Sequence, residues 1–398
     1  MDARDYFGYK NPDEEPGAPD PANDADEDGD RPPLFEEAVT LDDPATLRRI
    51  DPDDMLGRVI ELPGQLVQAR RVAAPIKLDP RFTDVDAVVV LAMGGSAIGA
   101  ELVAAAAGDR LRVPLIVHRD YGLPAGAGER TLVVAASHSG DTAETLSGFA
   151  TAQERKLPTA VITTGGRLAA SATAAGLPLL QYRLGGQPRA AVGFGVGLVH
   201  ELLARAGLIE GPDDLGAAAA AVEELLERIG PSVETDANPA KQLAWAIFGR
   251  IPVIYGHGPM AAVAHRWKTQ LNENAKAWAS WEQMPEANHN AIEGSINPRE
   301  LGDALYVIQL RDRAEPPEIE ERYRVVEELL GERSTNRNEV WADGPSALSR
   351  VLTGVAYGDL VSVFLAILYQ TDPTPVTLLA MLKERLARAT GSDPTGAR

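Results

Sequence analysis

The sequence predicts an α/β protein with two doubly wound domains, each a parallel sheet flanked by helices. Three observations support this prediction. Short apolar runs alternate with helical stretches of about 10–15 residues, the pattern of a parallel sheet covered on both faces. Two of these runs end in loops rich in glycine and hydroxyl side chains. The alternation then starts again in the second half of the chain, which predicts a degenerate copy of the first domain.

The predicted elements follow one another without long gaps. An Asp-Asp-Pro sequence at residues 42–44 is typical of a capped helix start, and helical stretches follow within residues 55–71. Apolar runs predict the strands of the first domain at 86–92, 114–118, 131–136, 160–164 and 178–182. Two helical segments come next, at 191–207 and 211–227. The second domain has predicted strands at 251–258, 303–310 and 338–341, and predicted helices at 348–369 and 377–387.

Bulk composition excludes several classes of protein. The 398 residues suffice for two domains, and a hydrophobic content of 44% suffices for their cores. There is no cysteine, which excludes disulfides, a cysteine nucleophile and thiolate metal sites. No uncharged, mainly apolar run reaches the roughly 18 residues of a membrane-spanning helix, and the N-terminus lacks a signal-peptide pattern. We therefore expect a cytoplasmic protein with no membrane partner.

The net charge of −20 is distributed unevenly. Residues 1–38 contain 13 acidic and 3 basic side chains, so about half of the excess lies in a tenth of the chain. This segment is too poor in apolar residues to offset the entropy lost on folding, so we expect residues 1–40 to form a disordered acidic tail. A solubilising extension is favoured over an interaction tail. The acidic balance of the remainder argues against a nucleic-acid partner.

The segment after the third apolar run carries three hydroxyl side chains. Ser137, Ser139 and Thr142 stand where this run ends and a helix is predicted to begin. Ser and Thr at a helix start accept hydrogen bonds from backbone N–H groups, and the positive end of the helix dipole favours an anion. One hydroxyl would be enough for an ordinary helix cap. Three of them favour a phosphate cradle over that alternative.

A second loop indicates the same chemistry. The first apolar run continues into Gly94, Gly95 and Ser96, where glycines let the backbone approach a ligand closely. The adjacent glycines disfavour the dinucleotide-binding pattern G-x-G-x-x-G, and no Gly-Lys-Ser/Thr ends the loop as in a Walker A motif. A plain strand-to-helix turn is the alternative.

The two loops resemble those of the sugar isomerase (SIS) domain, a doubly wound module that binds phosphosugars. Glu273 lies in a Glu-Asn-Ala-Lys sequence, and His289, sixteen residues later, lies between two asparagines. These motifs are similar to those of the bifunctional phosphoglucose/phosphomannose isomerases, and the resemblance runs from about residue 41 to the C-terminus. It implies tandem SIS domains at residues 41–210 and 211–398.

The resemblance implies an enzyme that interconverts glucose 6-phosphate or mannose 6-phosphate with fructose 6-phosphate through an enediol. The reaction needs a base over the first two carbons, an acid/base group for ring opening, donors for the enediolate oxygens and a phosphate anchor. It needs no cofactor. The sequence has no His-rich motif with metal-ligand spacing, so no metal is expected either.

Four residues match catalytic positions of the family. The resemblance assigns Glu273 as the carbon base, His289 and Lys383 to ring opening, and Arg189 to the enediolate. Each has a structural alternative: a solvated helix face for Glu273, a hydrogen-bonding role for His289, and a solvated surface charge for Lys383 and Arg189. In relatives the histidine reaches the site from the neighbouring subunit, which implies a homodimer with a shared active site.

Two positions depart from the usual pattern of the family. Ala291 replaces an acidic residue after the Asn-His-Asn sequence, so we expect the local hydrogen bonding of the histidine to differ, with an effect on rate or substrate preference. Asn288 and Asn290 form a polar turn that can orient its imidazole. Asp141 replaces the commoner Asn in the phosphate loop. A carboxylate is tolerable there only if it points away from the phosphate and caps a backbone N–H.

Two rival functions stay open at this point. A non-catalytic phosphosugar sensor would keep both loops but would not need Glu273, His289 and Lys383 together. An amino-sugar phosphate isomerase would handle an amine at the second carbon. The sequence does not distinguish a preference for the glucose or the mannose epimer, because the two differ in the direction of one hydroxyl.

Overall fold

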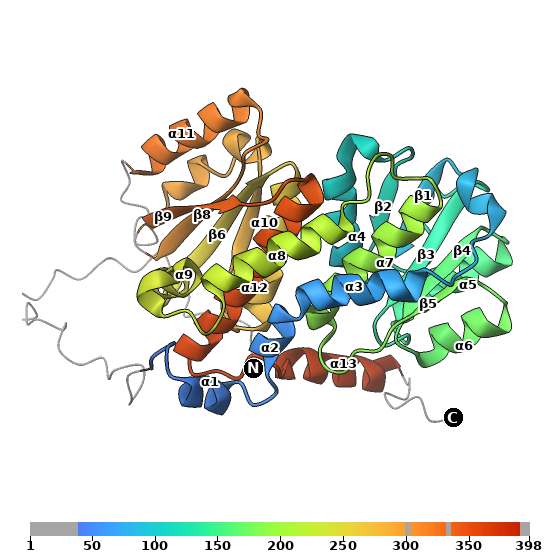
Figure 1. Cartoon of the computed structure of the whole chain (residues 1–398), viewed down its shortest axis with the longest axis horizontal. Helices are drawn as coiled ribbons and strands as arrows, with labels where there is room; N and C mark the ends of the chain where they lie inside the picture. Colours follow the sequence, from blue (N-terminus) through green and yellow to red (C-terminus); the bar gives the residue numbers. More distant parts are fainter. Residues whose placement is uncertain (1–38, 299–301, 303, 332–335, 391–398) are drawn as a thin grey trace, which may run out of the picture. The chain divides into compact units, whose positions relative to one another are not determined.

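A computed structural model describes residues 39–298, 302, 304–331 and 336–390 (Figure 1). The predicted acidic tail lies outside the described residues, except for its last two positions. The first helix, α1 (Pro44–Ile50), begins where the sequence predicts it. The carboxylate of Asp43 accepts hydrogen bonds from the backbone nitrogens of Ala45 and Thr46, which is the expected cap.

The first sheet has five parallel strands in the order β2-β1-β3-β4-β5. Its strands are β1 (Ala87–Leu91), β2 (Leu115–His118), β3 (Thr131–Ser137), β4 (Thr159–Thr163) and β5 (Leu179–Gln181). Each begins and ends within one residue of the predicted range. The central strands β1, β3 and β4 are buried on both faces and therefore continuously apolar, whereas the edge strands β2 and β5 are only partly buried. The chain leaves β1 for the edge strand β2 and then returns to β3 on the other side. The crevice between the carboxyl ends of β1 and β3 is therefore the expected place for a ligand.

Helices cover both faces of this sheet. Val88 and Val90 of β1 belong to the core shared with α3 (Leu62–Ala73), α4 (Gly94–Ala107) and α7 (Val192–Arg205). Val89 and Leu91 point the other way, to the side covered by α5 (Ala143–Glu154). The remaining helices of this half are α2 (Met55–Ile60) and α6 (Gly166–Ala174).

The second sheet has four parallel strands in the order β7-β6-β8-β9. Its strands are β6 (Ile251–His257), β7 (Ser280–Met284), β8 (Leu305–Asp312) and β9 (Asn336–Ala342). Its helices are α8 (Leu215–Ile229), α9 (Pro239–Ile247), α10 (Pro259–Glu273), α11 (Pro317–Gly331), α12 (Ala347–Leu368) and α13 (Thr377–Thr390). The strand β6 lies between β7 and β8 as β1 lies between β2 and β3, so the predicted repeat of the first half is confirmed.

Three elements of the second half are absent from the predictions. The edge strand β7 reads Ser-Trp-Glu-Gln-Met and is only partly buried, so it lacks an apolar run. The helix α11 is rich in Glu and Arg, and only Ile319, Tyr323, Val326 and Leu330 are buried, on one helical stripe. The third, α9, is a short helix capped by Asn238. The predicted helix at 211–227 begins later, at Leu215.

The helix α12 forms the centre of the second half. By length and composition it could cross a membrane, with a mean hydropathy of 2.0, but 94% of its most apolar window is buried inside the protein. It packs against α8, α9 and α10. These contacts identify α12 as a core helix. Its single buried acid, Asp359, faces an arginine of α10.

Candidate active site

The two predicted phosphate loops meet at the carboxyl ends of β1 and β3. The backbone N–H of His138 donates to the hydroxyl of Ser96, with 3.1 Å between nitrogen and oxygen. The hydroxyl of Ser137 lies 2.8 Å from that of Thr142 and also accepts from the backbone nitrogen of Gly140. Hydroxyls from both loops therefore surround one crevice, as a phosphate cradle requires.

The three predicted phosphate-binding hydroxyls lie at the end of a strand, in a loop and at a helix start. Ser137 is the last residue of β3, Ser139 lies exposed in the loop, and Thr142 is the N-cap residue of α5. The prediction that all three open a helix is therefore wrong for the two serines. Gly94, Gly95 and Ser96 form the first turn of α4 rather than a loop before it. Two helix N-termini consequently border the crevice, and their dipoles favour an anion there.

Two glycines in these loops have no room for a side chain. Gly140 has φ +74°, and a Cβ atom there would lie 1.9 Å from the carbonyl oxygen of Gly165. A Cβ atom on Gly95 would lie 3.0 Å from the backbone nitrogen of Arg189. The first turn of α4 therefore packs directly on the backbone that carries Arg189.

Asp141 turns away from the hydroxyls, as expected. Its Oδ1 accepts from the backbone nitrogen of Arg167 at 3.1 Å and from Nε of the same residue at 3.0 Å. The carboxylate is thus bound at the N-terminus of α6, where its charge is favourable. A phosphate in the cradle would face hydroxyls and helix ends instead of this carboxylate.

Arg189 is almost completely buried, with 1% of its surface exposed. Its Nε donates to the side-chain oxygen of Asn274 at 2.6 Å, and Nη1 donates to Glu273 Oε2 at 3.3 Å. Its Nη2 donates to the carbonyl oxygens of Pro373 and Thr374 at 2.6 and 2.9 Å. The alternative of a solvated loop arginine is therefore wrong.

Glu273 is the last residue of α10, and its side chain is 29% exposed. One carboxylate oxygen is held by Arg189, so the group is neither fully solvated nor free to turn. Because Arg189 packs on the first turn of α4, it links this carboxylate to the phosphate loops. The structure thus connects Gly95, Arg189 and Glu273, which are far apart in the sequence.

A second layer of side chains holds Arg189 in place. Arg266 of α10 donates to the carbonyl oxygen of Arg189 at 3.0 Å and forms a bidentate pair with Asp359. Burial raises the pKa of Asp359, and the Arg266 guanidinium opposes that rise. Asn274 also donates to the hydroxyl of Ser362 at 2.9 Å. The sequence signal for this layer is a lone acid, Asp359, within an apolar helix.

His138 is a further residue that the sequence predictions did not single out. Its Nδ1 lies 2.9 Å from the hydroxyl of Tyr182, and burial lowers the pKa of the imidazole. The two side chains border a small cavity between the phosphate loops and the segment before Arg189. The cavity is lined by Gly95, Ser96, Ala136, Ser137, His138, Ile162, Tyr182, Pro188, Ala191 and Gly195.

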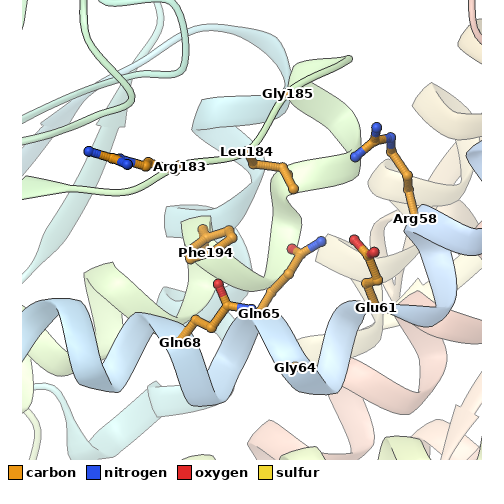
Figure 2. Close-up of a pocket in the computed structure, with 9 residues that line it drawn as sticks. All are labelled: Arg58, Glu61, Gly64, Gln65, Gln68, Arg183, Leu184, Gly185 and Phe194. Carbon is orange, nitrogen blue, oxygen red and sulfur yellow. The ribbon is translucent and has the colours of Figure 1, made fainter.

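A larger cavity of 480 Å³ lies next to this one, between α2, α3 and residues 183–185 (Figure 2). Its wall includes Phe194, whose ring stacks on that of Tyr182 with 4.6 Å between centroids. Figure 2 shows Arg58 and Arg183 on opposite sides of this cavity, so they do not form one anion site. None of the predicted catalytic or phosphate-binding residues lines it.

The structure does not join His289 or Lys383 to the other catalytic candidates within one chain. Both side chains are exposed, and among the described contacts neither forms a hydrogen bond or ion pair with Glu273. Among the described contacts, neither Asn288 nor Asn290 forms a hydrogen bond with the imidazole of His289. Their amide groups bind Arg322 and Glu286 instead, at 3.3 and 3.0 Å.

The second sheet carries different side chains at its switch point, the place at the carboxyl ends of β6 and β8 where the strand order reverses, as it does between β1 and β3. β8 ends in Asp312, which pairs with Arg350 at 2.7 Å, and the nearby Glu315 pairs with Arg311 at 3.0 Å. These buried carboxylates stand where the first half has hydroxyls, and they already occupy the arginines that could otherwise bind a phosphate. Of the two switch points, the one in the first sheet is therefore suited to a phosphosugar. Among the described residues, no group of three or more His, Asp or Glu is arranged to hold a metal ion.

The chain is similar to known proteins along most of its length. A bacterial phospho-glucose isomerase C-terminal SIS domain family matches residues 236–386. A bifunctional phosphoglucose/phosphomannose isomerase of Caldicellulosiruptor bescii is 36% identical over 335 residues, which are 84% of this chain and 99% of that protein. A protein of the same description from Aquifex aeolicus is 32% identical over 308 residues, 77% of this chain and 92% of that one.

A solved structure has the same fold. A hypothetical protein from Thermus thermophilus superimposes with a TM-score of 0.66 at 20% identity, and the match covers 86% of this chain and 94% of that one. At this identity the likeness concerns the fold alone. The sequence similarity to the two curated relatives goes further, because it covers almost the whole of each of them. The chain belongs to the bifunctional phosphoglucose/phosphomannose isomerase family.

Proposed function

We propose that this protein is an isomerase that interconverts glucose 6-phosphate and mannose 6-phosphate with fructose 6-phosphate through an enediol. One observation carries the proposal. A partly exposed carboxylate, Glu273, is held by Arg189, and Arg189 packs directly against the glycine turn of the phosphate cradle. A base is thereby linked to an anion site, as the reaction needs.

Each group has a role in the proposed reaction. The hydroxyls of Ser96, Ser137, Ser139 and Thr142 and the helix N-termini with Gly94 and Gly95 would hold the 6-phosphate. Glu273 would take the proton from the second carbon of the open-chain aldose and return it to the first. Arg189 would steady Glu273 and the developing negative charge, because its buried guanidinium points at that carboxylate.

The enediol explains why one site would accept two epimers. Glucose 6-phosphate and mannose 6-phosphate differ only in configuration at the second carbon. That carbon becomes planar in the enediol, so both sugars give the same intermediate. An enzyme that stabilises this intermediate lowers the barrier for both, and the two substrates differ in the face of the second carbon from which the proton is removed.

We propose a homodimer with a shared site for ring opening. The support is that His289 is exposed and carries no described contact to Glu273 of its own chain, as expected if its imidazole acts in the site of a partner subunit. Trp278, just before the edge strand β7, is 79% exposed, as expected for an aromatic side chain that a partner covers. Lys383 on α13 would act with His289.

The proposal extends to the organisation of the chain. We propose that residues 41–210 and 211–398 act as two SIS domains after an acidic tail at 1–40, and that the protein works in the cytoplasm. Each sheet lies within one proposed domain. The proposed reaction needs neither a cofactor nor a metal.

The experiment for the proposed function compares four sugars with the purified full chain. Glucose 6-phosphate and mannose 6-phosphate should both give fructose 6-phosphate in a coupled assay. Free glucose should not react measurably, because it lacks the anchor for the cradle. Turnover of glucosamine 6-phosphate alone would instead identify an amino-sugar isomerase. Binding of phosphosugars without turnover of any would identify a non-catalytic sensor.

A further inference from the structure

Lys276 closes the Glu-Asn-Ala-Lys motif and has no role in the proposed reaction. Its backbone is left-handed, with φ +54°, just beyond the end of α10. The ammonium lies within hydrogen-bond distance of four backbone carbonyl oxygens, those of Glu273 at 3.0 Å, Asn274 at 3.1 Å, Asp372 at 2.8 Å and Pro373 at 2.9 Å. A cation in this position also suits the negative end of the α10 dipole.

The four carbonyls belong to two segments that are about a hundred residues apart in the sequence. One is the end of α10, which carries Glu273. The other is Asp372–Thr374, which leads directly into α13 and therefore to Lys383. Arg189 binds the same short segment from its own side, through the carbonyls of Pro373 and Thr374. Two cations thus hold one stretch of backbone against the candidate active site.

The apolar side chains of α13 contribute little to holding this helix in place. They stay largely exposed, with Leu378 at 80% and Leu382 at 53%. Burial of apolar surface therefore does little to fix α13 on the described part of its own chain. The hydrogen bonds to residues 372–374 are the described contacts that define where α13 begins.

We propose that Lys276 is a positioning residue that fixes Asp372–Thr374, and with it the start of α13, at the catalytic end of α10. The activity readouts below depend on the proposed isomerase function, whereas the hydrogen-exchange readout does not. Lys276 does not contact the reacting atoms in this proposal. It would act by keeping the helix that carries Lys383 at a fixed position relative to the carboxylate of Glu273.

The charge of Lys276 gives the proposal a pH dependence. Partial burial of the ammonium, together with Arg189, lowers the pKa of Lys276 to about 8, while Asp372 and Glu273 act in the opposite direction. Among the described residues, these three are the charged side chains that act on it. Above this pH the neutral amine has one proton fewer and donates weaker hydrogen bonds. The contact between Asp372–Thr374 and the end of α10 should therefore weaken as the pH rises through about 8, and kcat should fall.

The test compares Lys276→Met with Lys276→Arg in the full-length protein. For Lys276→Met we expect kcat to fall about 10- to 100-fold with KM within about threefold, because the catalytic groups lose their relative position. Hydrogen exchange in peptides covering residues 372–386 should be about 10-fold faster. Lys276→Arg should restore most of kcat and remove the fall above pH 8, because arginine stays charged.

Lys156→Met is the matched control. Lys156 is also exposed, and its backbone is also left-handed, with φ +55°. It lies after α5, far along the chain from the end of α10 and from residues 372–374. Its replacement should change neither kcat nor the hydrogen exchange of residues 372–386. Unchanged hydrogen exchange at residues 372–386 in Lys276→Met, in a protein with normal circular dichroism, would overturn the proposal. Absence of isomerase activity in the wild type would contradict the proposed function, and the exchange data would still decide the role of Lys276.

Discussion

Replacing Glu273 with glutamine should lower kcat for isomerisation by about 10²- to 10⁴-fold, the usual contribution of a general base. Glutamine keeps the shape of the side chain but cannot accept the proton of the second carbon. Arg189 retains its other acceptors, which are Asn274, Pro373 and Thr374, so the pocket should keep its form. Affinity for fructose 6-phosphate, measured by calorimetry, should stay within about threefold of the wild type, because the phosphate cradle is untouched.

Glu223→Gln provides the control for this experiment. Glu223 lies on α8 and has no place in the proposed site. The variant removes the same charge from the protein and should leave kcat unchanged. Turnover of Glu273→Gln near the wild-type rate would contradict the assignment of the base. If the variant lost both fructose 6-phosphate binding and turnover, the result would indicate a structural role for Glu273.

Two individually inactive variants, Glu273→Gln and His289→Ala, should regain activity when their subunits are exchanged. If each site takes Glu273 from one subunit and His289 from the other, a mixed dimer has one site with both defects and one with neither. Half of the dimers are mixed after random exchange. Recovery should therefore approach roughly a quarter of wild-type activity on these symmetry grounds.

Exchange itself must be verified in the mixing experiment, for example by mass spectrometry of dimers with one labelled subunit. Mixing Glu273→Gln with wild type, each at the same concentration, gives the reference for a dimer with one defective site. Failure to recover activity despite complete exchange would contradict the shared site. So would full activity of a protein that sediments as a monomer.

The central strands β1, β3 and β4 of the first sheet could be predicted closely because burial on both faces leaves a continuous apolar signal, and the partly exposed edge strands β2 and β5 still carry short apolar runs. The edge strand β7 gives no such signal, since its side chains are only half buried and include Glu282 and Gln283. The helix α11 does show its apolar stripe in the sequence, at Ile319, Tyr323, Val326 and Leu330. It was missed because the numerous Glu and Arg residues between those positions hide the pattern.

The candidate site was predictable where its residues are close in the sequence. The hydroxyl and glycine loops are local motifs, and a turn of Asp141 away from the cradle follows from the repulsion between a carboxylate and a phosphate. The link between Arg189 and Glu273 joins residues 84 positions apart, and the support from Asp359 joins α10 to α12. Such contacts depend on how the helices pack, which local spacing does not encode.

Isomerisation of fructose 6-phosphate in deuterium oxide, followed by NMR, tests the central proposal most directly. Glucose 6-phosphate and mannose 6-phosphate should both form, and both should carry deuterium at the second carbon. The reason is that the proton held by Glu273 in the enediol state can exchange with solvent before it returns to carbon. Aldose products without any deuterium at that carbon, or no aldose product at all, would contradict the proposed proton transfer by Glu273.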